Sequence, residues 1–383
     1  MKIALVHELL TMRGGAEKVL RILADMFPSA PIYTLLYDEK KLGDWFPRER
    51  VRSSILQNSL TTHYSLLTTH SINHHLYLRQ FPRAVEAWDF SEFDLVISTS
   101  SAFVHGIITN GRPKHLCIVN SPARYLWDRT HDVLEQANKG MFGWFKKKYL
   151  ERTFHTLRIW DSETADRPEM LLSASKIVQR RVELYWRRSS EVVYPPIDDC
   201  WLMQNQTIKL SNQQTSKPVN YLLVSTLVPY KRIDLAIEAC NALGRPLTIV
   251  GDGPDRKRLE KLAGPTITFA GYTPADKLRS YYESASAVIF PGDEDFGLVP
   301  LEAMACGTPV VAYRSGGALE TIVEGETGEF FDEPTGESLQ EAMKKFEQKK
   351  YSKDKLFAQA KKFSRSEFEA KVMSAVNLLM IKE

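Results

Sequence analysis

The second half of this 383-residue chain alternates short apolar runs with segments whose apolar residues fall at helical spacing. Alternation on this scale is typical of βαβ units, in which helices join parallel strands. The predicted strands cover 221–225, 247–250, 267–269, 287–290 and 309–312, and the predicted helices cover 233–243, 255–262, 277–284 and 299–305. Ligands of such sheets bind beyond the carboxyl ends of the strands, so the loops after these runs are candidates for a site.

The first half shows the same alternation less clearly. An apolar run at 2–6 is followed by Gly14 and Gly15 and then by a predicted helix at 16–27, which together indicate a strand, a glycine loop and a helix. Two further strands are predicted at 94–98 and 116–119, where apolar runs have turn-rich flanks. This half is therefore expected to form a second parallel-sheet domain.

The chain is too long for one hydrophobic core, because single cores stop growing at roughly 250–300 residues. Pro195 and Pro196 interrupt regular structure, since proline lacks a backbone donor and restrains the residue before it. A polar stretch follows at 204–217. The predicted domains are therefore 1–196 and 197–365, and residues 366–383 form a predicted terminal helix that is expected to pack back on the first domain.

Composition narrows the class of protein. Hydrophobic residues make up 43% of the chain and charged residues 25%, as in a globular enzyme. The four cysteines lack the spacing of a zinc site or a disulfide framework, so no metal is expected. His7 and Glu8 interrupt what would be the apolar core of a signal peptide, and no apolar run reaches membrane-spanning length, so a cytoplasmic location is predicted. The net charge of +3 disfavours nucleic-acid binding.

Two glutamates eight positions apart mark the candidate site. Glu294 lies in the loop after the predicted strand 287–290, and Glu302 lies in the opening turn of the predicted helix 299–305. A lone glutamate at the start of a helix commonly only stabilises the helix dipole. The polar loop 292–297 favours a binding site instead, because its glycine-flanked amides can approach a ligand closely. Two carboxylates can then accept hydrogen bonds from vicinal hydroxyls, which are abundant on a hexose and a ribose.

A pair of cations stands at the start of another predicted helix. Lys231 and Arg232 follow the strand 221–225, where helix amides and side-chain charge can jointly hold a phosphate. A solvated basic turn explains two adjacent charges equally well. The Gly-Asp-Gly-Pro turn at 251–254 is interpreted as a structural turn that can border the same site.

Together these segments resemble the retaining glycosyltransferase family 4, also called glycosyl transferases group 1. The resemblance runs along almost the whole chain and is carried by GGAEKV at 14–19, YLLVSTLVPYKRIDLAIEA at 221–239, VGDGP at 250–254 and EDFGLVPLEAMACGTPVVA at 294–312. It implies the α/β fold named GT-B, with two Rossmann-like lobes whose parallel sheets face a central cleft. It also implies a hexosyltransferase that uses a nucleoside-diphosphate sugar and retains the anomeric configuration.

The resemblance assigns roles to individual residues. Glu294 would touch the donor sugar and Lys231 would neutralise the diphosphate, so these two are the predicted catalytic residues. Glu302 would bind the nucleotide ribose. The other predicted donor-binding residues are Arg232, Asp295, Phe296, Gly297, Leu298, Gly15 and Thr226, and the predicted acceptor-side residues are Asn120 and His105. Enzymes of this family usually need no divalent metal, so no cofactor is expected.

Three further segments, HLCIVNSPARYLWD, RIWDSETADRPE and VVYPPID, are similar to a subgroup often named mannosyltransferases of polysaccharide or O-antigen assembly. GDP-mannose is therefore the favoured donor, with glucose as the second choice of sugar, and the expected acceptor is a glycan or a lipid-linked hydroxyl. Two positions depart from the family. Thr226 stands where an arginine is frequent, which leaves Arg232 to supply part of that charge, and Asn120 stands where a histidine is frequent.

Two other interpretations concern activity. Thr226 and Asn120 are compatible with a GT-B relative that binds its ligands but has lost or weak turnover. Intact Glu294, Glu302 and Lys231 argue against that alternative. A nicotinamide-dependent enzyme is disfavoured, because the glycines near the amino terminus do not form the GxGxxG pattern.

The segment 139–160 mixes aromatic residues with lysines and is predicted to be mostly helical. Between residues 139 and 188 the chain has twelve Lys/Arg and six Asp/Glu, a local excess of positive charge. Two interpretations are equally compatible with it. The lysines lie on a solvated helix face, or the segment attaches the protein peripherally to anionic lipid at the inner face of the membrane.

Overall fold

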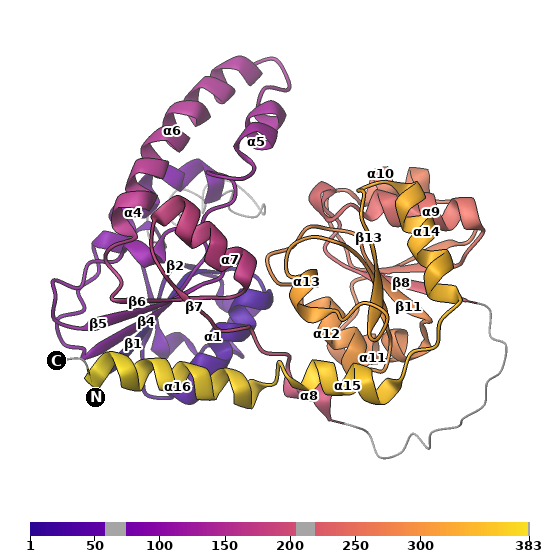
Figure 1. The fold of residues 1–383 in the computed structure, drawn as a ribbon. Coiled ribbons are helices and arrows are strands. Elements are labelled where there is room, and N and C mark those ends of the chain that lie inside the picture. Colours follow the sequence, from indigo (N-terminus) through magenta and orange to yellow (C-terminus); the bar gives the residue numbers. More distant parts are fainter. Residues whose placement is uncertain (58–73, 204–218, 382–383) are drawn as a thin grey trace. The chain divides into compact units, whose positions relative to one another are not determined.

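The computed structural model describes residues 1–57, 74–203 and 219–381, and the chain divides into two compact units. The first unit comprises Met1–Tyr194 and the chain from Glu369 onward, and the second comprises Pro195–Phe368. This boundary falls two residues before the expected one at 196, and the polar stretch 204–217 lies outside the described residues. Each unit is built on its own parallel sheet (Figure 1).

The sheet of the first unit has seven strands in the order β3-β2-β1-β4-β5-β6-β7, and all neighbours are parallel. The strands are β1 (Ile3–Leu10), β2 (Ile32–Tyr37), β3 (Val51–Ser53), β4 (Leu95–Ser100), β5 (Lys114–Val119), β6 (Met170–Ser173) and β7 (Glu191–Val192). Strands β1, β4 and β5 are almost wholly buried, as their continuous apolar sequences require. The strand order reverses between β1 and β4, which is the switch point where such sheets bind ligands.

Helices cover this sheet and extend from it. They are α1 (Gly15–Met26), α2 (Glu39–Leu42), α4 (Phe81–Glu86), α5 (Thr130–Ala137), α6 (Gly143–Thr164) and α7 (Lys176–Arg181). Helix α1 packs on β1 and β4 and buries Val19, Leu20 and Leu23. Helices α5 and α6 contact each other and project away from the sheet as a pair (Figure 1).

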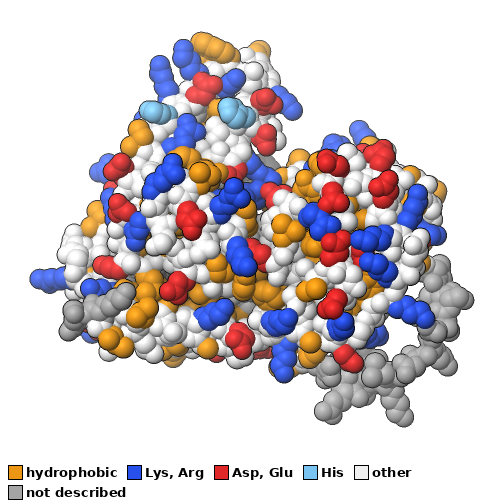
Figure 2. All heavy atoms as spheres, in the orientation of Figure 1, with side chains coloured by type: hydrophobic (Ala, Val, Ile, Leu, Met, Phe, Trp, Pro, Cys, Tyr) orange, Lys and Arg blue, Asp and Glu red, His pale blue; other side chains and the backbone are white. Residues whose placement is uncertain are grey.

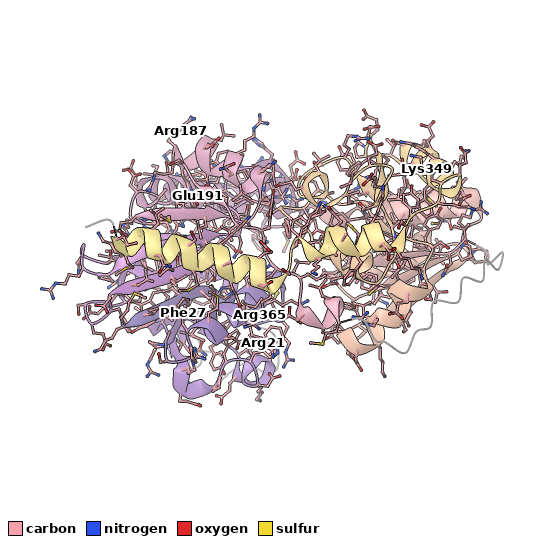
Figure 3. All side chains as sticks on the ribbon, turned by 60° about the horizontal axis from the view of Figure 1, so that its bottom comes forward. Arg21, Phe27, Arg187, Glu191, Lys349 and Arg365 are labelled. Carbon is pink, nitrogen blue, oxygen red and sulfur yellow. The ribbon has the colours of Figure 1, made fainter. Side chains whose placement is uncertain are left out.

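The terminal helix α16 (Arg365–Ile381) belongs to the first unit from Glu369 onward. Its buried side chains include Val372 and Val376, and the ammonium of Lys371 lies 5.6 Å from the ring centroid of Tyr194. In Figure 3 the helix starts at Arg365 and runs along the first unit.

The sheet of the second unit has six parallel strands in the order β10-β9-β8-β11-β12-β13. The strands are β8 (Tyr221–Val224), β9 (Leu247–Val250), β10 (Ile267–Gly271), β11 (Ala287–Phe290), β12 (Val310–Tyr313) and β13 (Gly328–Phe331). The helices are α8 (Asp199–Leu202), α9 (Ile233–Leu243), α10 (Arg256–Leu262), α11 (Ala275–Ser284), α12 (Leu298–Ala305), α13 (Ala318–Thr321), α14 (Gly336–Glu347) and α15 (Lys353–Lys361). The order reverses between β8 and β11, so this sheet has a switch point of the same kind as the first.

All nine elements predicted between residues 221 and 312 are present, with ends within two residues of the prediction. The pattern does not predict β13, because the strand includes Glu329. This glutamate is fully buried, and the ammonium groups of Lys345 and Lys349 lie 2.7 and 2.6 Å from its carboxylate. A buried charge is acceptable when such partners compensate it, and the partners come from a later part of the chain.

A buried polar cluster lies between β4 and α6 in the first unit. Asp161 in α6 is 1% exposed, and its Oδ2 accepts hydrogen bonds from the indole N–H groups of Trp127 and Trp186 at 2.8 and 2.7 Å. Its Oδ1 has no hydrogen-bond partner among the described residues and lies 3.7 Å from Nε2 of His105. Burial raises the pKa of Asp161 to about 7, against the two indole bonds, and lowers the pKa of His105 to about 3.

The raised pKa of Asp161 predicts a pH-dependent stability. The folded protein binds a proton at Asp161 between about pH 4 and pH 7 that the unfolded chain does not, so the contribution of Asp161 to the free energy of unfolding falls as the pH rises through that window. The lowered pKa of His105 acts in the opposite direction in parent and variant alike, so the test compares the two proteins. Asp161→Asn removes this titration and keeps an oxygen for the indole groups. Between pH 4 and pH 8, the difference in free energy of unfolding between variant and parent should shift by roughly 1–4 kcal/mol in favour of the variant, as measured by urea unfolding.

Asp166→Asn is the matched control. Asp166 is exposed and pairs with Arg188 at 3.4 Å, so its loss should change the free energy of unfolding by less than about 1 kcal/mol. A parent and an Asp161→Asn variant whose stabilities run parallel from pH 4 to pH 8 would contradict the assignment.

Candidate functional site

The switch point of the second sheet brings together the loops that follow β8 and β11. These strands are parallel neighbours, with Val288 opposite Leu222. Because their carboxyl ends meet at one edge of the sheet, the residues that follow them lie close together. The predicted site residues Thr226, Lys231 and Glu294 come from these two loops.

Lys231 and Glu294 form an ion pair at this edge. Nζ of Lys231 lies 2.5 Å from Oε1 of Glu294, and the two side chains are 17% and 22% exposed. Lys231 ends a short 3-10 turn that starts at Pro229, and its ammonium also lies 5.4 Å from the ring centroid of Tyr230. The structure thus brings together the two residues that were predicted to be catalytic.

A Ser-Gly-Gly turn after β12 holds the backbone around Glu294. The N–H of Gly317 donates to the carbonyl of Glu294 at 2.9 Å, and the hydroxyl of Ser315 donates to the carboxylate of Asp293 at 2.9 Å. Gly316 has a φ of +59°, and a Cβ there would lie 2.2 Å from the carbonyl oxygen of Glu294. Only glycine combines this φ with so close an approach, so the turn fixes where the Glu294 backbone lies.

Two more glycines shape the loop between β11 and α12. A Cβ at Gly292 would lie 3.2 Å from Cα of Lys231, so this loop runs close to the one after β8. Gly297 has a φ of +82°, and a Cβ there would lie 2.6 Å from the ring of Phe290. Helix α12 then begins at Leu298 without a side-chain cap. The first amides of a helix have no partner within the helix, and they favour an anion.

Phe296 and Asp295 complete this loop. The ring of Phe296 is buried, with its centroid 5.7 Å from that of Phe363, so only the Phe296 backbone can serve a ligand. Asp295 is partly exposed.

Glu302 lies deeper than expected. It is the fifth residue of α12, one position further into the helix than predicted, so it falls in the second turn and not in the opening turn. Its side chain is largely buried, and Oε2 accepts a hydrogen bond from the hydroxyl of Tyr282 at 3.0 Å. Burial and the neighbouring carboxylate raise the pKa of Tyr282, which therefore stays a donor and orients Glu302.

The turn at 251–254 packs against the loop after β8. The N–H of Leu227 donates to the carbonyl of Asp252 at 3.0 Å, and the N–H of Asp255 donates to the carbonyl of Leu227 at 3.0 Å. A Cβ at Gly253 would lie 2.3 Å from the same Leu227 oxygen. The turn thus supports the loop that carries Thr226, whose side chain is exposed.

The side chain of Arg232 pairs with Asp234 in the helix that it caps. It caps α9 with a φ of +51°, and its guanidinium lies 3.3 Å from Oδ2 of Asp234 and 3.4 Å from the carbonyl of Pro334. Asp234 in the first turn of α9 therefore offsets part of the charge expected to replace an arginine at Thr226.

The switch point of the first sheet holds a buried carboxylate. Glu8 near the end of β1 accepts hydrogen bonds from the N–H groups of Ser101, Ala102 and Val104 at 2.5, 2.7 and 3.2 Å, and from that of Phe103. Burial raises the pKa of Glu8, although these backbone bonds oppose the shift. The side chain of Glu8 thus occupies the amides that follow β4.

The glycine loop after β1 is held by the side chain of Glu17. Gly15 is exposed and is the first residue of α1. The N–H of Gly14 donates to Oε2 of Glu17 at 2.9 Å, and Oε1 of Glu17 lies 3.7 Å from Nε2 of His7. Gly15 therefore stands at a carboxyl edge, but in the unit that does not contain Lys231 and Glu294.

The two predicted acceptor-side residues differ in accessibility. Asn120 follows β5, is partly exposed, and donates a hydrogen bond from its amide to the hydroxyl of Ser101 at 3.3 Å. His105 is fully buried, and its ring stacks on Trp186 with centroids 4.4 Å apart. In this structure the His105 ring does not reach the surface, so only Asn120 is placed to contact a bound molecule.

Three residues that support the site were not singled out from the sequence. Ser315 and Gly316 follow a predicted strand, and a Ser-Gly-Gly run directly after a strand is a signal that could have found them. Tyr282 carries no such signal, because a tyrosine at an apolar helix position is ordinarily a core residue.

Metal and membrane features were also sought. In the described ranges, no group of three or more His, Cys, Asp or Glu side chains is arranged to hold a metal ion. The cysteines are free thiols, and Cys117 and Cys240 are buried. No helix within 1–57, 74–203 or 219–381 is both long and apolar enough to cross a membrane.

Comparison with known proteins finds a family match within the second unit. Residues 204–363 match the family described as "Glycosyl transferases group 1". A segment of 127 residues is 38% identical to the GDP-mannose-dependent alpha-(1-6)-phosphatidylinositol monomannoside mannosyltransferase of Mycolicibacterium smegmatis and covers 28% of this chain and 33% of the relative. A segment of 176 residues is 32% identical to the D-inositol 3-phosphate glycosyltransferase of Acidothermus cellulolyticus and covers 39% of each chain. The matches thus span only about a third of these relatives.

The fold is shared over nearly the full length with a solved structure. Anabaena HepE in complex with UDP superposes with a TM-score of 0.70 at 18% identity, covering 98% of this chain and 100% of that one. The expected α/β fold with two Rossmann-like units is confirmed, and so is the expected glycosyltransferase domain in the second unit.

The Ser-Gly-Gly turn predicts a sharp difference between two glycines. Gly316→Ala should lower the free energy of unfolding by about 2–4 kcal/mol, because a left-handed φ and a clash with the Glu294 carbonyl both oppose a side chain. Gly244→Ala is the matched control, since Gly244 has a φ of +60° and no atom within 4 Å of a Cβ. It should cost only about 1 kcal/mol. Equal losses in urea unfolding would show that the turn does not constrain Glu294.

Proposed function

Because residues 204–363 carry a glycosyl transferases group 1 domain, we propose that this protein is a retaining glycosyltransferase that moves a hexose from a nucleoside-diphosphate sugar to a hydroxyl. The observation that carries the proposal is the ion pair of Lys231 and Glu294, 2.5 Å apart at the switch point of the second sheet. In this proposal the pair supplies a cation for phosphate and a carboxylate for sugar hydroxyls, next to the amino end of α12, which has no side-chain cap.

The two members of the pair have different tasks in this proposal. Without a ligand each neutralises the other, so neither charge is left uncompensated in a partly buried place. A bound diphosphate offers Lys231 more negative charge than Glu294 does. The carboxylate of Glu294 then turns to the hydroxyls of the donor sugar, and Glu302, oriented by Tyr282, accepts hydrogen bonds from the ribose.

The proposed reaction exchanges one bond for another. The bond between the anomeric carbon and the phosphate oxygen breaks, and the nucleoside diphosphate leaves with the electron pair. Lys231 and the amides of Leu298 and Val299 stabilise the departing charge. The acceptor oxygen bonds to the anomeric carbon on the same face, and its proton passes to a phosphate oxygen of the donor. No enzymic nucleophile and no metal are assigned to this step.

Mannose from GDP-mannose is the favoured donor. The support is the 38% identity to a relative named as GDP-mannose-dependent, in a segment that covers 28% of this chain. Glucose is the second choice of sugar. The guanine of the proposed donor rests on the same relative, whereas Anabaena HepE, which shares the fold, was solved in complex with UDP.

The acceptor is proposed to be a glycan or lipid-linked hydroxyl that binds over the first unit. Asn120 at the end of β5 is the proposed contact, since its side-chain amide lies at the surface of that carboxyl edge. Polysaccharide or O-antigen assembly is the proposed setting.

Loss of the Glu294 carboxylate should stop the reaction without unfolding the protein. Glu294→Ala should lower turnover of GDP-mannose at least about a hundredfold, because the side chain would hold the sugar where charge develops. Glu326→Ala is the matched control. Glu326 also pairs with a lysine, Lys355 at 2.8 Å, but it precedes β13 and so lies at the opposite edge of the sheet. Full activity of Glu294→Ala would overturn the proposal.

A panel of nucleotide sugars tests the donor separately. GDP-mannose should raise the unfolding temperature more than UDP- or ADP-sugars, because a ligand at about 100 times its Kd stabilises the folded state by about 2.7 kcal/mol. Lys231→Gln should remove most of this shift. Stabilisation by a donor without turnover on any offered acceptor would favour the alternative, a GT-B relative that only binds. That alternative has some support, since Asp234 engages the cation Arg232.

A further inference from the structure

The end of the α5–α6 pair is the most exposed apolar surface that the described residues form. We define the α5–α6 apex as residues 138–149, the turn between the helices and the first two turns of α6. Its large apolar side chains are 90%, 69%, 58% and 67% exposed at Met141, Phe142, Trp144 and Phe145. Soluble surfaces rarely gather so many large apolar side chains unless they bind something. Figure 2 shows hydrophobic side chains at the outermost end of this projection, with Lys and Arg side chains close by.

The backbone of the apex is tightly built. Gly140 has a φ of +90°, and a Cβ at Gly143 would lie 2.0 Å from the carbonyl oxygen of Asn138. The turn therefore brings the end of α5 close to the start of α6, and this geometry turns Met141 and Phe142 outward. Trp144 and Phe145 support each other edge to face with ring centroids 4.7 Å apart. The backbone geometry of the turn thus keeps these apolar side chains exposed, and they do not contribute to the apolar core of the unit.

Positive charge surrounds the same residues. From Asn138 to Arg152 the chain has five lysines and arginines and one glutamate, Glu151, which lies 4.0 Å from Lys147. Lys148 lies over the ring of Trp144 at 5.0 Å. Helix α6 also begins here with no acidic residue in its first turn and no side-chain cap, so its amino end adds partial positive charge.

These features fit one class of partner. Trp and Phe side chains enter the interface of a bilayer, where an indole contacts both the apolar interior and the polar headgroups. The methylene stems of lysines lie along the apolar region while their ammonium groups contact anionic phosphates. The apex lies at the projecting end of the α5–α6 pair (Figure 1), where a flat partner such as a bilayer can reach it. A second copy of this chain would bring like charges together. We propose that the α5–α6 apex docks the protein peripherally on an anionic phospholipid bilayer.

Vesicle flotation of the full chain tests the proposal. The parent should bind vesicles made of equal amounts of phosphatidylcholine and phosphatidylglycerol, and this binding should be lost at high salt. It should not bind vesicles of phosphatidylcholine alone. Trp144→Ser with Phe145→Ser, and Lys146→Gln with Lys147→Gln and Lys148→Gln, should each lower binding at least about tenfold. Both sets of residues are mostly exposed, so thermal unfolding should match the parent.

The matched control removes the same charge elsewhere. Lys257→Gln with Lys261→Gln and Lys277→Gln changes three exposed lysines of the second unit and should retain binding within about twofold. Equal loss in this control would overturn the proposal, because net charge alone would then explain binding. Absence of flotation would overturn it too, as would self-association that the Trp144→Ser, Phe145→Ser variant abolishes.

Fluorescence places the apex in the lipid. Brominated lipids quench a tryptophan that enters the bilayer, so anionic vesicles of such lipids should quench part of the parent's emission. Trp144→Phe keeps the apolar anchor and removes this fluorophore, so it should float like the parent and show no quenching. Quenching that persists in Trp144→Phe would contradict insertion at the apex.

Discussion

The ion pair between Lys231 and Glu294 depends on how two parallel strands end. Strands β8 and β11 are neighbours at the point where the strand order reverses, so the loops beyond them leave the sheet side by side. Glycines then allow these loops to approach each other closely. Gly292 lets one loop approach Lys231, and Gly316 lets a third loop hold the carbonyl of Glu294. The position of each charge is thus set mainly by backbone, which keeps a site in place when its ligand is absent.

Much of this arrangement could be read from the sequence, because it follows from periodicity. A parallel sheet buried on both faces requires continuous apolar runs, and those runs gave the strands around Lys231 and Glu294 to within two residues. The order of such strands follows general rules for right-handed crossovers, so the placement of both residues at one edge was predictable as well.

The remaining features depend on contacts between distant parts of the chain. Glu302 is oriented by Tyr282, twenty residues earlier, and nothing in the local pattern distinguishes that tyrosine from a core residue. Glu329 sits in a buried strand only because Lys345 and Lys349 reach it. His105 is polar and follows a strand, yet it lies in the core, because Trp186 and Asp161 surround it. A local sequence pattern indicates the chemistry that a residue can perform, whereas the packing of distant segments determines whether its side chain is accessible.

The two sheets share a strand order, but their switch points are chemically unlike. In the first unit the amides of residues 101–104 already have an anion, the carboxylate of Glu8, supplied by the neighbouring strand. A phosphate cannot use those amides while the carboxylate is there. The first unit thus satisfies these amides with one of its own side chains, whereas the first amides of α12 in the second unit have no side-chain cap. A substitution of Glu8 by a neutral residue would leave the amides of residues 101–104 without the carboxylate that now accepts their hydrogen bonds.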